Sequence, residues 1–389
     1  MSPAEPSPGL LQPVFAGVLS AVVGFASTFA LVLHGYTVVG ATPAQAAGAL
    51  LAVCLAQGAL AIWLSARWRM PITLAWSTPG SALLAASAMP EGGFPAAIGA
   101  FLVAGALIVA AGLWKPFGRA AAGIPSALAS AMLAGILFEI CLAPVRAAGA
   151  MPTLALPVIL AWALTWRFAR LFAVPVAVLV AGAIILMTTP LPAGGMAAIS
   201  WPAPIMPQFS LTAAIGLGLP LFLVTMASQN VPGLAVLHAH GYRPAPGPIF
   251  TATGLTSLLI APFGAHPFNL AALTAALCAG HDAHPDPARR WVASAAGGTA
   301  YMVLGLGAGL AAAIIAAAPP LLIQTVAGLA LLGTLGGALT SAVVEERNRL
   351  PAMATFVTTA SGLSVFGIGA AFWGLLAGGA LMLLDRLRR

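Results

Sequence analysis

The stretch Ala75-Trp76-Ser77-Thr78-Pro79-Gly80, the first break, interrupts an apolar run that continues to Met89. A second break, Phe263-Gly264-Ala265-His266-Pro267-Phe268-Asn269, interrupts the run that ends at Ala279. Each has an extended lead-in, a proline suited to the first helical turn, and then only about ten to thirteen helical residues. A helix that crosses a bilayer needs about 20. We therefore predict two half-helices, Ser77–Met89 and His266–Ala279, whose N-termini lie near the membrane midplane.

The N-terminus of a helix offers free N–H groups and the positive end of the helix dipole. Two such N-termini that face each other are suited to binding an anion. The two breaks therefore predict a shared anion site in the middle of the membrane.

The composition places most of the chain in lipid. Of 389 residues, 61% are apolar and 6% are charged, and the mean hydropathy is +1.03. A soluble domain carries about 25% charged residues. Residues 1–12 are expected to form a short disordered cytoplasmic tail, because they are rich in proline and serine and lack a basic signal-peptide region.

The apolar runs predict fourteen spans, of which the third and tenth contain the breaks. They are Pro13–Val38, Pro43–Ala66, Ile72–Met89, Phe94–Trp114, Ser126–Pro144, Thr153–Phe168, Ala173–Pro190, Leu211–His238, Pro248–Pro262, His266–Ala279, Pro287–Ala316, Pro319–Val344, Leu350–Phe366 and Ile368–Leu384. A proline-rich linker separates the seventh span from the eighth.

The basic residues support this count. With the N-terminus inside, 14 of the 15 Lys and Arg residues follow or end even-numbered spans, on the cytoplasmic side, and only Arg146 does not. The 14 are Arg67, Arg69, Lys115, Arg119, Arg167, Arg170, Arg243, Arg289, Arg290, Arg347, Arg349, Arg386, Arg388 and Arg389. Both termini are therefore predicted to be cytoplasmic.

Seven spans in each half make the second half inverted relative to the first, as in many secondary transporters. Ala26-Ser27 and His34 in span 1 have counterparts in Ala227-Ser228 and His238 in span 8. Broken spans in matching positions of two repeats are a good sequence indicator of a transporter's binding site.

At the first break, Ser77 and Thr78 are good N-cap residues before Pro79 and Gly80. Capping alone is one interpretation, and contact of these groups with substrate is the other, because a break at midplane depth must line a cavity or be covered by protein. At the second break, Asn269 and the backbone after Pro267 play the matching part. Phe268 either stacks on an aromatic ring or packs in the core.

Span 8 contains Ser228-Gln229-Asn230, and two adjacent amides inside a membrane are costly unless they face a cavity or a partner. A cavity is favoured, with a helix–helix hydrogen bond as the alternative. On span 1, the repeat mate, Phe25, Ser27 and Thr28 are the weaker corresponding candidates.

Few titratable groups are placed for proton coupling. Glu139 is the only acidic residue within an apolar run, and it either relays protons or pairs with Arg146. His266 at the second break either titrates or donates a hydrogen bond.

Other chemistries are disfavoured. Residues 281–286 contain two histidines and two aspartates, but a solvated loop is a more economical interpretation than a metal site. The three cysteines lack metal-ligand spacing, and the sequence has no P-loop and no spaced nucleophile–base pair. We therefore expect no cofactor, no metal, no nucleic-acid partner and no enzymatic activity.

Four stretches give the chain a resemblance to the benzoate/proton symporter family (BenE type). They are residues 73–80, residues 125–135 (Pro-Ser-Ala-Leu-Ala-Ser-Ala-Met-Leu-Ala-Gly), residues 266–272 (His-Pro-Phe-Asn-Leu-Ala-Ala) and residues 284–290 (His-Pro-Asp-Pro-Ala-Arg-Arg). The resemblance implies import of benzoate with a proton across the inner membrane. It also implies kinship with the uracil, xanthine and sulfate/bicarbonate carriers.

Carriers of that group have a seven-plus-seven inverted fold, in which a core domain moves against a gate domain, commonly in a dimer. The resemblance implies core segments at 13–120 and 211–316, gate segments at 121–190 and 317–389, and a linker at 191–210. The related nucleobase carriers bind substrate with glutamates on spans 8 and 10. This chain has Gln229 and Asn230 on span 8 and no acid on span 10, which fits an anionic substrate.

The combined hypothesis is an aromatic carboxylate held between the two half-helices by alternating access. Ser77, Thr78, Gly80 and Asn269 would donate to the carboxylate, Phe25 and Phe268 would flank the ring, and Gln229 and Asn230 would complete the polar wall. The proton would travel on His266, on Glu139 or on the substrate. The alternatives are a carrier of another organic or inorganic anion and a passive anion channel.

Overall fold

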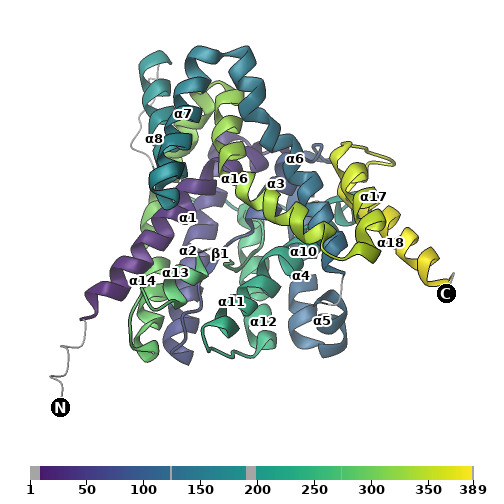
Figure 1. Cartoon of the computed structure of the whole chain (residues 1–389), viewed down its shortest axis with the longest axis horizontal. Helices are drawn as coiled ribbons and strands as arrows, with labels where there is room; N and C mark the ends of the chain where they lie inside the picture. The colour runs from purple at the N-terminus through teal and green to yellow at the C-terminus, as the bar shows by residue number, and fades with distance from the viewer. Residues whose placement is uncertain (1–8, 123–124, 190–198, 273, 388–389) are drawn as a thin grey trace.

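The computed structural model describes residues 9–122, 125–189, 199–272 and 274–387 (Figure 1). Within these residues, seven helices are long and apolar enough to cross a membrane, or eight if the bent pair Pro287–Leu306 and Ala308–Ala317 is one span. A mostly helical membrane fold is therefore confirmed, whereas the count of fourteen spans stays a prediction.

Most predicted spans coincide with one helix each. These helices are α1 (Leu11–Val38), α2 (Pro43–Trp68), α4 (Gly93–Leu113), α6 (Ser126–Ala150), α7 (Pro152–Phe168), α8 (Ala173–Thr188), α12 (Pro246–Ile260), α14 (Trp291–Leu306), α16 (Pro320–Val343), α17 (Arg349–Ala360) and α18 (Ala370–Leu387). The shorter elements are β1 (Leu74–Trp76), α3 (Thr78–Ala85), α5 (Lys115–Ala122), α9 (Leu211–Ala213), α10 (Leu219–Thr225), α11 (Val231–Ala239), β2 (Phe268–Leu270), α13 (Ala275–Ala279) and α15 (Ala308–Ala317).

The two breaks meet as a pair of short strands near the middle of the molecule. Strands β1 and β2 are antiparallel, and Ala75 lies opposite Asn269. Trp76 and Phe268, the next pair in the register, are both fully buried. Hydrogen bonds between the strands satisfy backbone groups that apolar surroundings would otherwise leave unpaired. The extended lead-ins expected at both breaks are therefore present.

The second half-helix is shorter and starts later than the sequence predicts. We expected a helix from His266 with Pro267 in its first turn, but residues 268–270 form β2 and helix α13 begins at Ala275. The prediction was wrong because pairing with β1 holds this segment extended. The first half-helix, α3, begins at Thr78, one residue after the predicted Ser77, and ends at Ala85, before the predicted Met89.

Helices around the strand pair form one packed group. Helix α2 packs along α14, α1 along α14 and α3, and α12 along α4. Gly58 and Gly298 allow α2 and α14 to approach closely, because a Cβ on either glycine would collide with the backbone oxygen of the other. The backbones at this contact are therefore tightly apposed.

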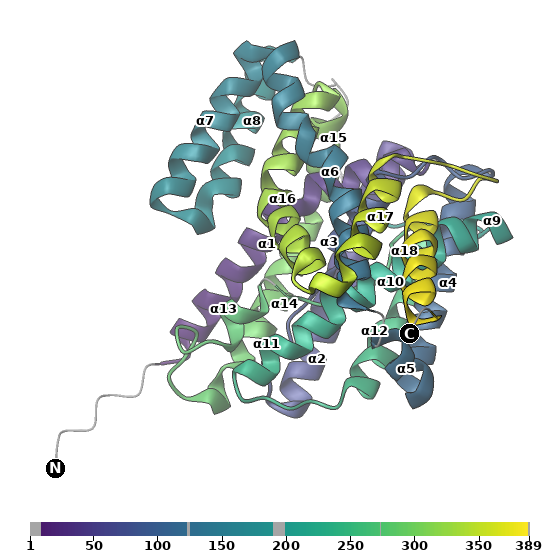
Figure 2. The same ribbon diagram turned by 45° about the vertical axis from the view of Figure 1, so that its right-hand side comes forward.

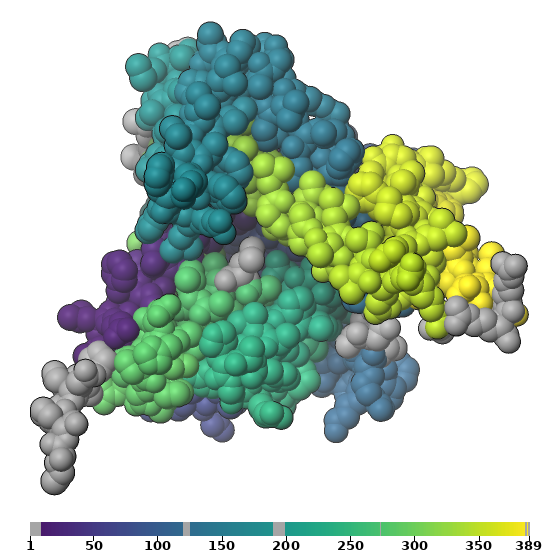
Figure 3. Space-filling model, in the orientation of Figure 1, coloured from purple at the N-terminus to yellow at the C-terminus, as the bar shows by residue number. Residues whose placement is uncertain are grey.

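A second group of helices covers one side of the first. Helix α6 packs against α16 and α17, and α7 packs against α8 (Figure 2). In the space-filling view, the yellow-green surface of residues around α16 and α17 lies across the green and teal surface of the first group (Figure 3). The predicted core and gate boundaries stay predictions.

The eighth predicted span is a composite helix. Residues Leu211–Ala239 form one apolar helical stretch, in which π-helical turns at Ala214–Gly218 and Met226–Asn230 alternate with α9, α10 and α11. A π turn contains an extra residue and is frequent at functional sites. The second π turn contains the polar residues Ser228, Gln229 and Asn230.

Several boundaries differ from the sequence prediction. Helix α6 continues through Pro144 to Ala150, α5 adds a helix after span 4, and α14 and α15 meet at an angle of 52°. Residues 361–369, assigned to the last two spans, form a loop between α17 and α18. Residues 1–8 of the predicted tail and 191–198 of the predicted linker lie outside the described residues.

Candidate functional site

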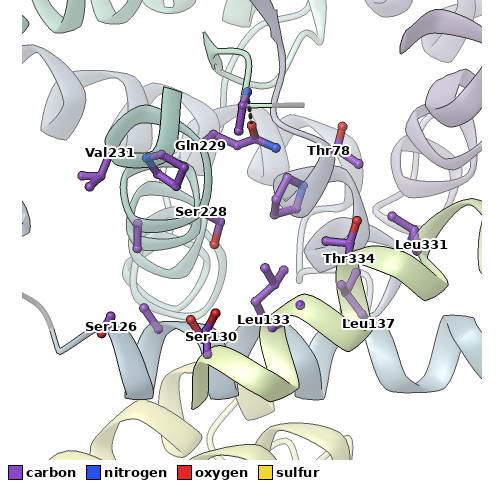
Figure 4. A pocket seen from close by; sticks show the side chains of 18 of the residues that line it. Thr78, Ser126, Ser130, Leu133, Leu137, Ser228, Gln229, Val231, Leu331 and Thr334 are labelled. Atoms are coloured by element: carbon purple, nitrogen blue, oxygen red, sulfur yellow. Dashed lines mark hydrogen bonds between the residues drawn. The ribbon is translucent and has the colours of Figure 1, made fainter. Parts of the chain in front are cut away.

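A cavity of about 390 Å³ lies between the two groups of helices (Figure 4). One wall comes from the start of α3 and the π turn before α11, and includes Thr78, Pro79 and Gln229. The opposite wall comes from α6 and α16. No residue with a charged side chain lines the cavity among those that the structure describes. A ligand in this cavity is therefore held by dipoles, hydroxyl groups and apolar contacts.

The start of α3 is organised by Ser77. Its hydroxyl oxygen accepts from the Gly80 N–H at 3.1 Å and from the Thr225 hydroxyl at 2.9 Å. Ser77 is fully buried and does not line the cavity, so it acts here as an N-cap. The Gly80 N–H, which we expected to contact substrate, is used by this cap.

Thr78 is the donor that the cap leaves available. Its side chain lines the cavity, and neither its hydroxyl nor its backbone N–H has a hydrogen-bond partner among the described residues. Pro79 follows it and supplies an apolar surface without an N–H. An anion at this end of the cavity would find the positive end of the α3 dipole together with two free donors.

The Gln229 side chain is held in one orientation by the second break. Its Oε1 accepts from the Ala272 N–H at 3.3 Å, the contact drawn as a dashed line in Figure 4. The amide nitrogen, with its two donor hydrogens, lies on the Thr78 side of the group (Figure 4). Gln229 therefore presents donors to the cavity, because its acceptor is already in use.

Asn230 is turned away from the cavity. Its Oδ1 accepts from the Leu270 N–H at 3.1 Å, and its Nδ2 lies 3.3 Å from Met226 Sδ. The side chain is fully buried. Asn230 therefore connects the π turn to strand β2 by a hydrogen bond. This packing role is similar to the helix–helix hydrogen bond that was the alternative for the two amides.

His266 is buried in a hydrogen-bond network that joins α1, α3 and the second break. The Tyr36 hydroxyl lies 2.6 Å from Nδ1, and the Ser81 hydroxyl and the Ser77 carbonyl oxygen lie 3.1 and 3.3 Å from Nε2. Ser81 Oγ also donates to the Ser77 carbonyl. Nε2 therefore donates to oxygen acceptors, and Nδ1 shares its hydrogen bond with the Tyr36 hydroxyl, so both ring nitrogens have protein partners.

The remaining residues of the second break lie in strand β2 or directly before it. Phe268 and Asn269 are both fully buried, and neither they nor Pro267 line the cavity. The Asn269 side-chain oxygen and nitrogen have no hydrogen-bond partner among the described residues. Asn269, the predicted donor, and Phe268, the predicted ring contact, therefore lie behind the cavity wall.

The candidates on α1 belong to an aromatic cluster. Phe25 stacks on Phe29 with ring centroids 5.3 Å apart and meets the edge of Trp76 at 5.6 Å. The Ser27 hydroxyl donates to the Val23 carbonyl at 2.5 Å. Neither Phe25 nor Ser27 lines the cavity.

Glu139 is ion-paired with Arg146, and both side chains are about half exposed. Glu139 lines a different cavity of about 680 Å³, which includes the C-terminal end of α3 and the loop after α17. Such an exposed pair contributes little to stability. This pairing matches the alternative given for Glu139 above.

The segment after α13 is a loop in which His281, Asp282 and Asp286 are exposed, as expected, while two of its side chains turn inward. His284 and Arg290 are buried, and Arg290 donates to the carbonyl oxygens of Ala279, His284 and Pro285. This guanidinium caps the C-terminal end of the second half-helix. No cluster of three or more potential metal ligands occurs in the described part of the chain.

The wall formed by α6 and α16 contains cavity residues that the sequence analysis did not select. On α6, Ser126, Ser130, Leu133 and Leu137 recur at spacings of four, three and four, and so share one helix face. On α16 the lining includes Leu331, Thr334 and Ser341. The first three of the α6 residues lie in the family-like stretch 125–135, so that stretch was the available signal.

Comparisons with known proteins agree with this architecture. Residues 9–384 match the family model BenE, described as benzoate membrane transport protein. The chain is 41% identical to "Inner membrane protein YdcO" of Escherichia coli (strain K12), with 96% of this chain and 95% of that protein covered. It is 31% identical to the "Benzoate membrane transport protein" of Acinetobacter baylyi, with 95% and 93% covered.

Solved structures share the fold at low sequence identity. The transmembrane domain of the cyanobacterial bicarbonate transporter BicA has a TM-score of 0.63 at 15% identity, with 95% of this chain and 97% of that one covered. The murine Solute Carrier 26 family member A9 anion transporter, in its inward-facing state, has a TM-score of 0.68 at 11% identity, with 99% and 69% covered. These likenesses establish a membrane transporter fold.

Proposed function

Because this chain belongs to the BenE family of benzoate membrane transport proteins, we propose that it imports benzoate, or a similar aromatic carboxylate, together with a proton across the inner membrane. It is a membrane transport protein of a family that is not enzymatic. The observation that carries the proposal is the cavity between Thr78 and Gln229. It offers donors at one end, apolar surface along its walls and no charged lining side chain among the described residues.

In the proposed complex, the carboxylate accepts hydrogen bonds from Thr78 and from the Gln229 amide nitrogen. Both groups line the cavity and have hydrogens free to donate. The ring then contacts the apolar side chains of Pro79, Leu133 and Leu331. Because the Gln229 oxygen is occupied by Ala272, this end of the cavity favours an acceptor group such as a carboxylate.

A proton is needed for uptake against the membrane potential. An inside-negative potential opposes entry of one negative charge by about 2.3 kcal/mol per 100 mV. A proton carried with each anion removes this cost and adds the pH gradient as a driving force. Both ring nitrogens of His266 are hydrogen-bonded and Glu139 is ion-paired, which favours the substrate carboxyl as the proton carrier.

We further propose fourteen spans in two inverted halves, with cytoplasmic termini, a moving core, a gate and a homodimeric assembly. Support comes from the one-to-one order of predicted spans and observed elements, in which β1–α3 and β2–α13 replace the third and tenth helices. In this arrangement, the cavity between the two helix groups opens and closes as the groups move relative to one another.

Purified protein in liposomes gives the test. Protein-containing vesicles should accumulate labelled benzoate when the interior is alkaline, above protein-free vesicles that report passive entry of benzoic acid. Saturable uptake that ignores an imposed pH gradient would refute proton coupling. The absence of saturable uptake above protein-free vesicles would refute benzoate transport itself.

A further inference from the structure

The cavity is larger than benzoate needs. An apolar cavity of about 150 Å³ is enough to hold a benzene molecule. The cavity here measures about 390 Å³, more than twice that volume. The unused space lies against α6 and α16, if the carboxylate is at Thr78 and Gln229.

Hydroxyl groups on that wall lack protein partners. Ser130 on α6 and Thr334 on α16 line the cavity without a hydrogen-bond partner among the described residues. Ser228 lines the facing wall, and its hydroxyl also has no hydrogen-bond partner among the described residues. In Figure 4 these three side chains surround the space below Gln229.

Two other hydroxyls on α16 behave differently. Thr340 on the same helix as Thr334 donates to the Gly336 carbonyl at 2.9 Å, and Thr325 donates to the Leu321 carbonyl at 2.8 Å. Such back-bonding to the preceding turn is the usual way in which a helix satisfies a hydroxyl. The hydroxyls at the cavity are therefore available to a ligand, whereas these are not.

Glycines on α16 leave room beside the free hydroxyls. Gly333 and Gly337, about one turn apart, line the cavity, and a Cβ built on either would meet no atom within 4 Å. Thr334 lies between them in sequence. The wall therefore combines open volume with hydrogen-bonding groups that can both donate and accept.

We propose that this part of the cavity is a second subsite, formed by Ser130, Ser228, Thr334 and the space at Gly333 and Gly337, which recognises a hydroxyl substituent on the ring of the cargo. The inference rests on the proposed function, because the carboxylate end fixes which part of the ligand reaches this wall. The cargo class then includes hydroxylated aromatic carboxylates as well as benzoate.

Competition against labelled benzoate with the purified full-length protein tests the subsite. The 3- and 4-hydroxybenzoates should compete about three- to tenfold more strongly than the methylbenzoates of similar size, as one or two extra hydrogen bonds would give. The ratio of hydroxybenzoate to methylbenzoate potency should fall to about one in the triple variant Ser130→Ala/Ser228→Ala/Thr334→Val. Thr340→Val, which removes a back-bonded hydroxyl from the same helix, should keep the wild-type ratio.

Gly337→Val gives an independent test of the volume. It should weaken competition by a fused-ring acid such as 2-naphthoate about tenfold relative to benzoate. Gly336→Val, at a glycine that does not line the cavity and also has open space around it, should not change that ratio.

The possible outcomes separate the two proposals. If benzoate binds but hydroxyl- and methyl-substituted acids compete equally, or if the preference survives in the triple variant, the subsite is overturned and the proposed function stands. If no aromatic carboxylate binds the wild-type protein, both are overturned.

Discussion

The two breaks look alike in sequence but contribute differently to the site. The first yields helix α3 of eight residues, whose N-cap Ser77 is hydrogen-bonded to Gly80. The second yields a buried strand and helix α13 of five residues without a side-chain cap. The first break therefore offers a helix N-terminus, while the second offers backbone N–H groups that orient Gln229 and Asn230.

This difference shows that two breaks of similar sequence need not offer the same chemistry. A helix shorter than two turns has little dipole to offer, so the second break acts through neighbouring amides. Changes at the two breaks should consequently affect different properties: anion binding at the cavity and stability at the strands.

The largest effect is expected from Gln229→Glu. The new carboxylate would keep the bond from Ala272 but face the substrate anion, and two like charges about 4 Å apart repel by about 4 kcal/mol at an effective dielectric constant of about 20. Benzoate affinity should fall at least a hundredfold, at about 1.4 kcal/mol per factor of ten.

Calorimetric or radioligand binding measures this change, with Gln229→Met as the uncharged control. Gln229→Met should reduce affinity only about tenfold, because it removes donors without adding charge. Unchanged binding in Gln229→Glu would place the carboxylate elsewhere.

A smaller effect should separate two buried amides near the second break. Asn230→Leu leaves the Leu270 N–H without its partner, which should destabilise the protein by about 1–3 kcal/mol. Asn269→Leu replaces an amide that has no partner among the described residues, so stability should stay equal or rise.

Thermal unfolding of the two variants in the same detergent gives the comparison. A midpoint several degrees lower for Asn230→Leu, but not for Asn269→Leu, is the expected result. Equal losses would mean that Asn269 has a partner, such as an ordered water molecule.

The smallest effect concerns the helix caps. Ser77→Ala removes the acceptor for the Gly80 N–H and for the Thr225 hydroxyl and should cost about 1–2 kcal/mol. Thr274→Ala, at the N-cap position of α13, should change nothing measurable, since that side chain makes no cap bond. Unfolding midpoints again provide the readout, and a loss in Thr274→Ala as large as in Ser77→Ala would contradict the asymmetry of the breaks.

Local rules predicted the parts of the fold that depend on local sequence. Serine, threonine and proline at residues 77–79 correctly predicted the start of α3. The same proline rule was wrong at Pro267, because the next three residues pair with β1, nearly 200 residues away. Sequence periodicity contains no information about such a long-range partner.

The site was predictable to a similar extent. Thr78, Pro79 and Gln229 were selected from the sequence and line the cavity, but the orientation of the Gln229 amide depends on Ala272, 43 residues further along the chain. The roles of the lining residues stay predictions. The lining residues of α6 and α16 are mostly serines and leucines of a kind found in any membrane helix. Only the packing of the two helix groups identifies these residues as cavity wall.

The wide turn at Met226–Asn230 has one more consequence. It adds a residue relative to an ordinary helical turn, so everything after it is rotated by roughly 100° about the axis. Removing Ala227 from this turn should restore regular α-helical winding and rotate Gln229 away from the cavity, although the Gln229 side chain itself would still be present. For this span, length counted in residues matters as much as composition.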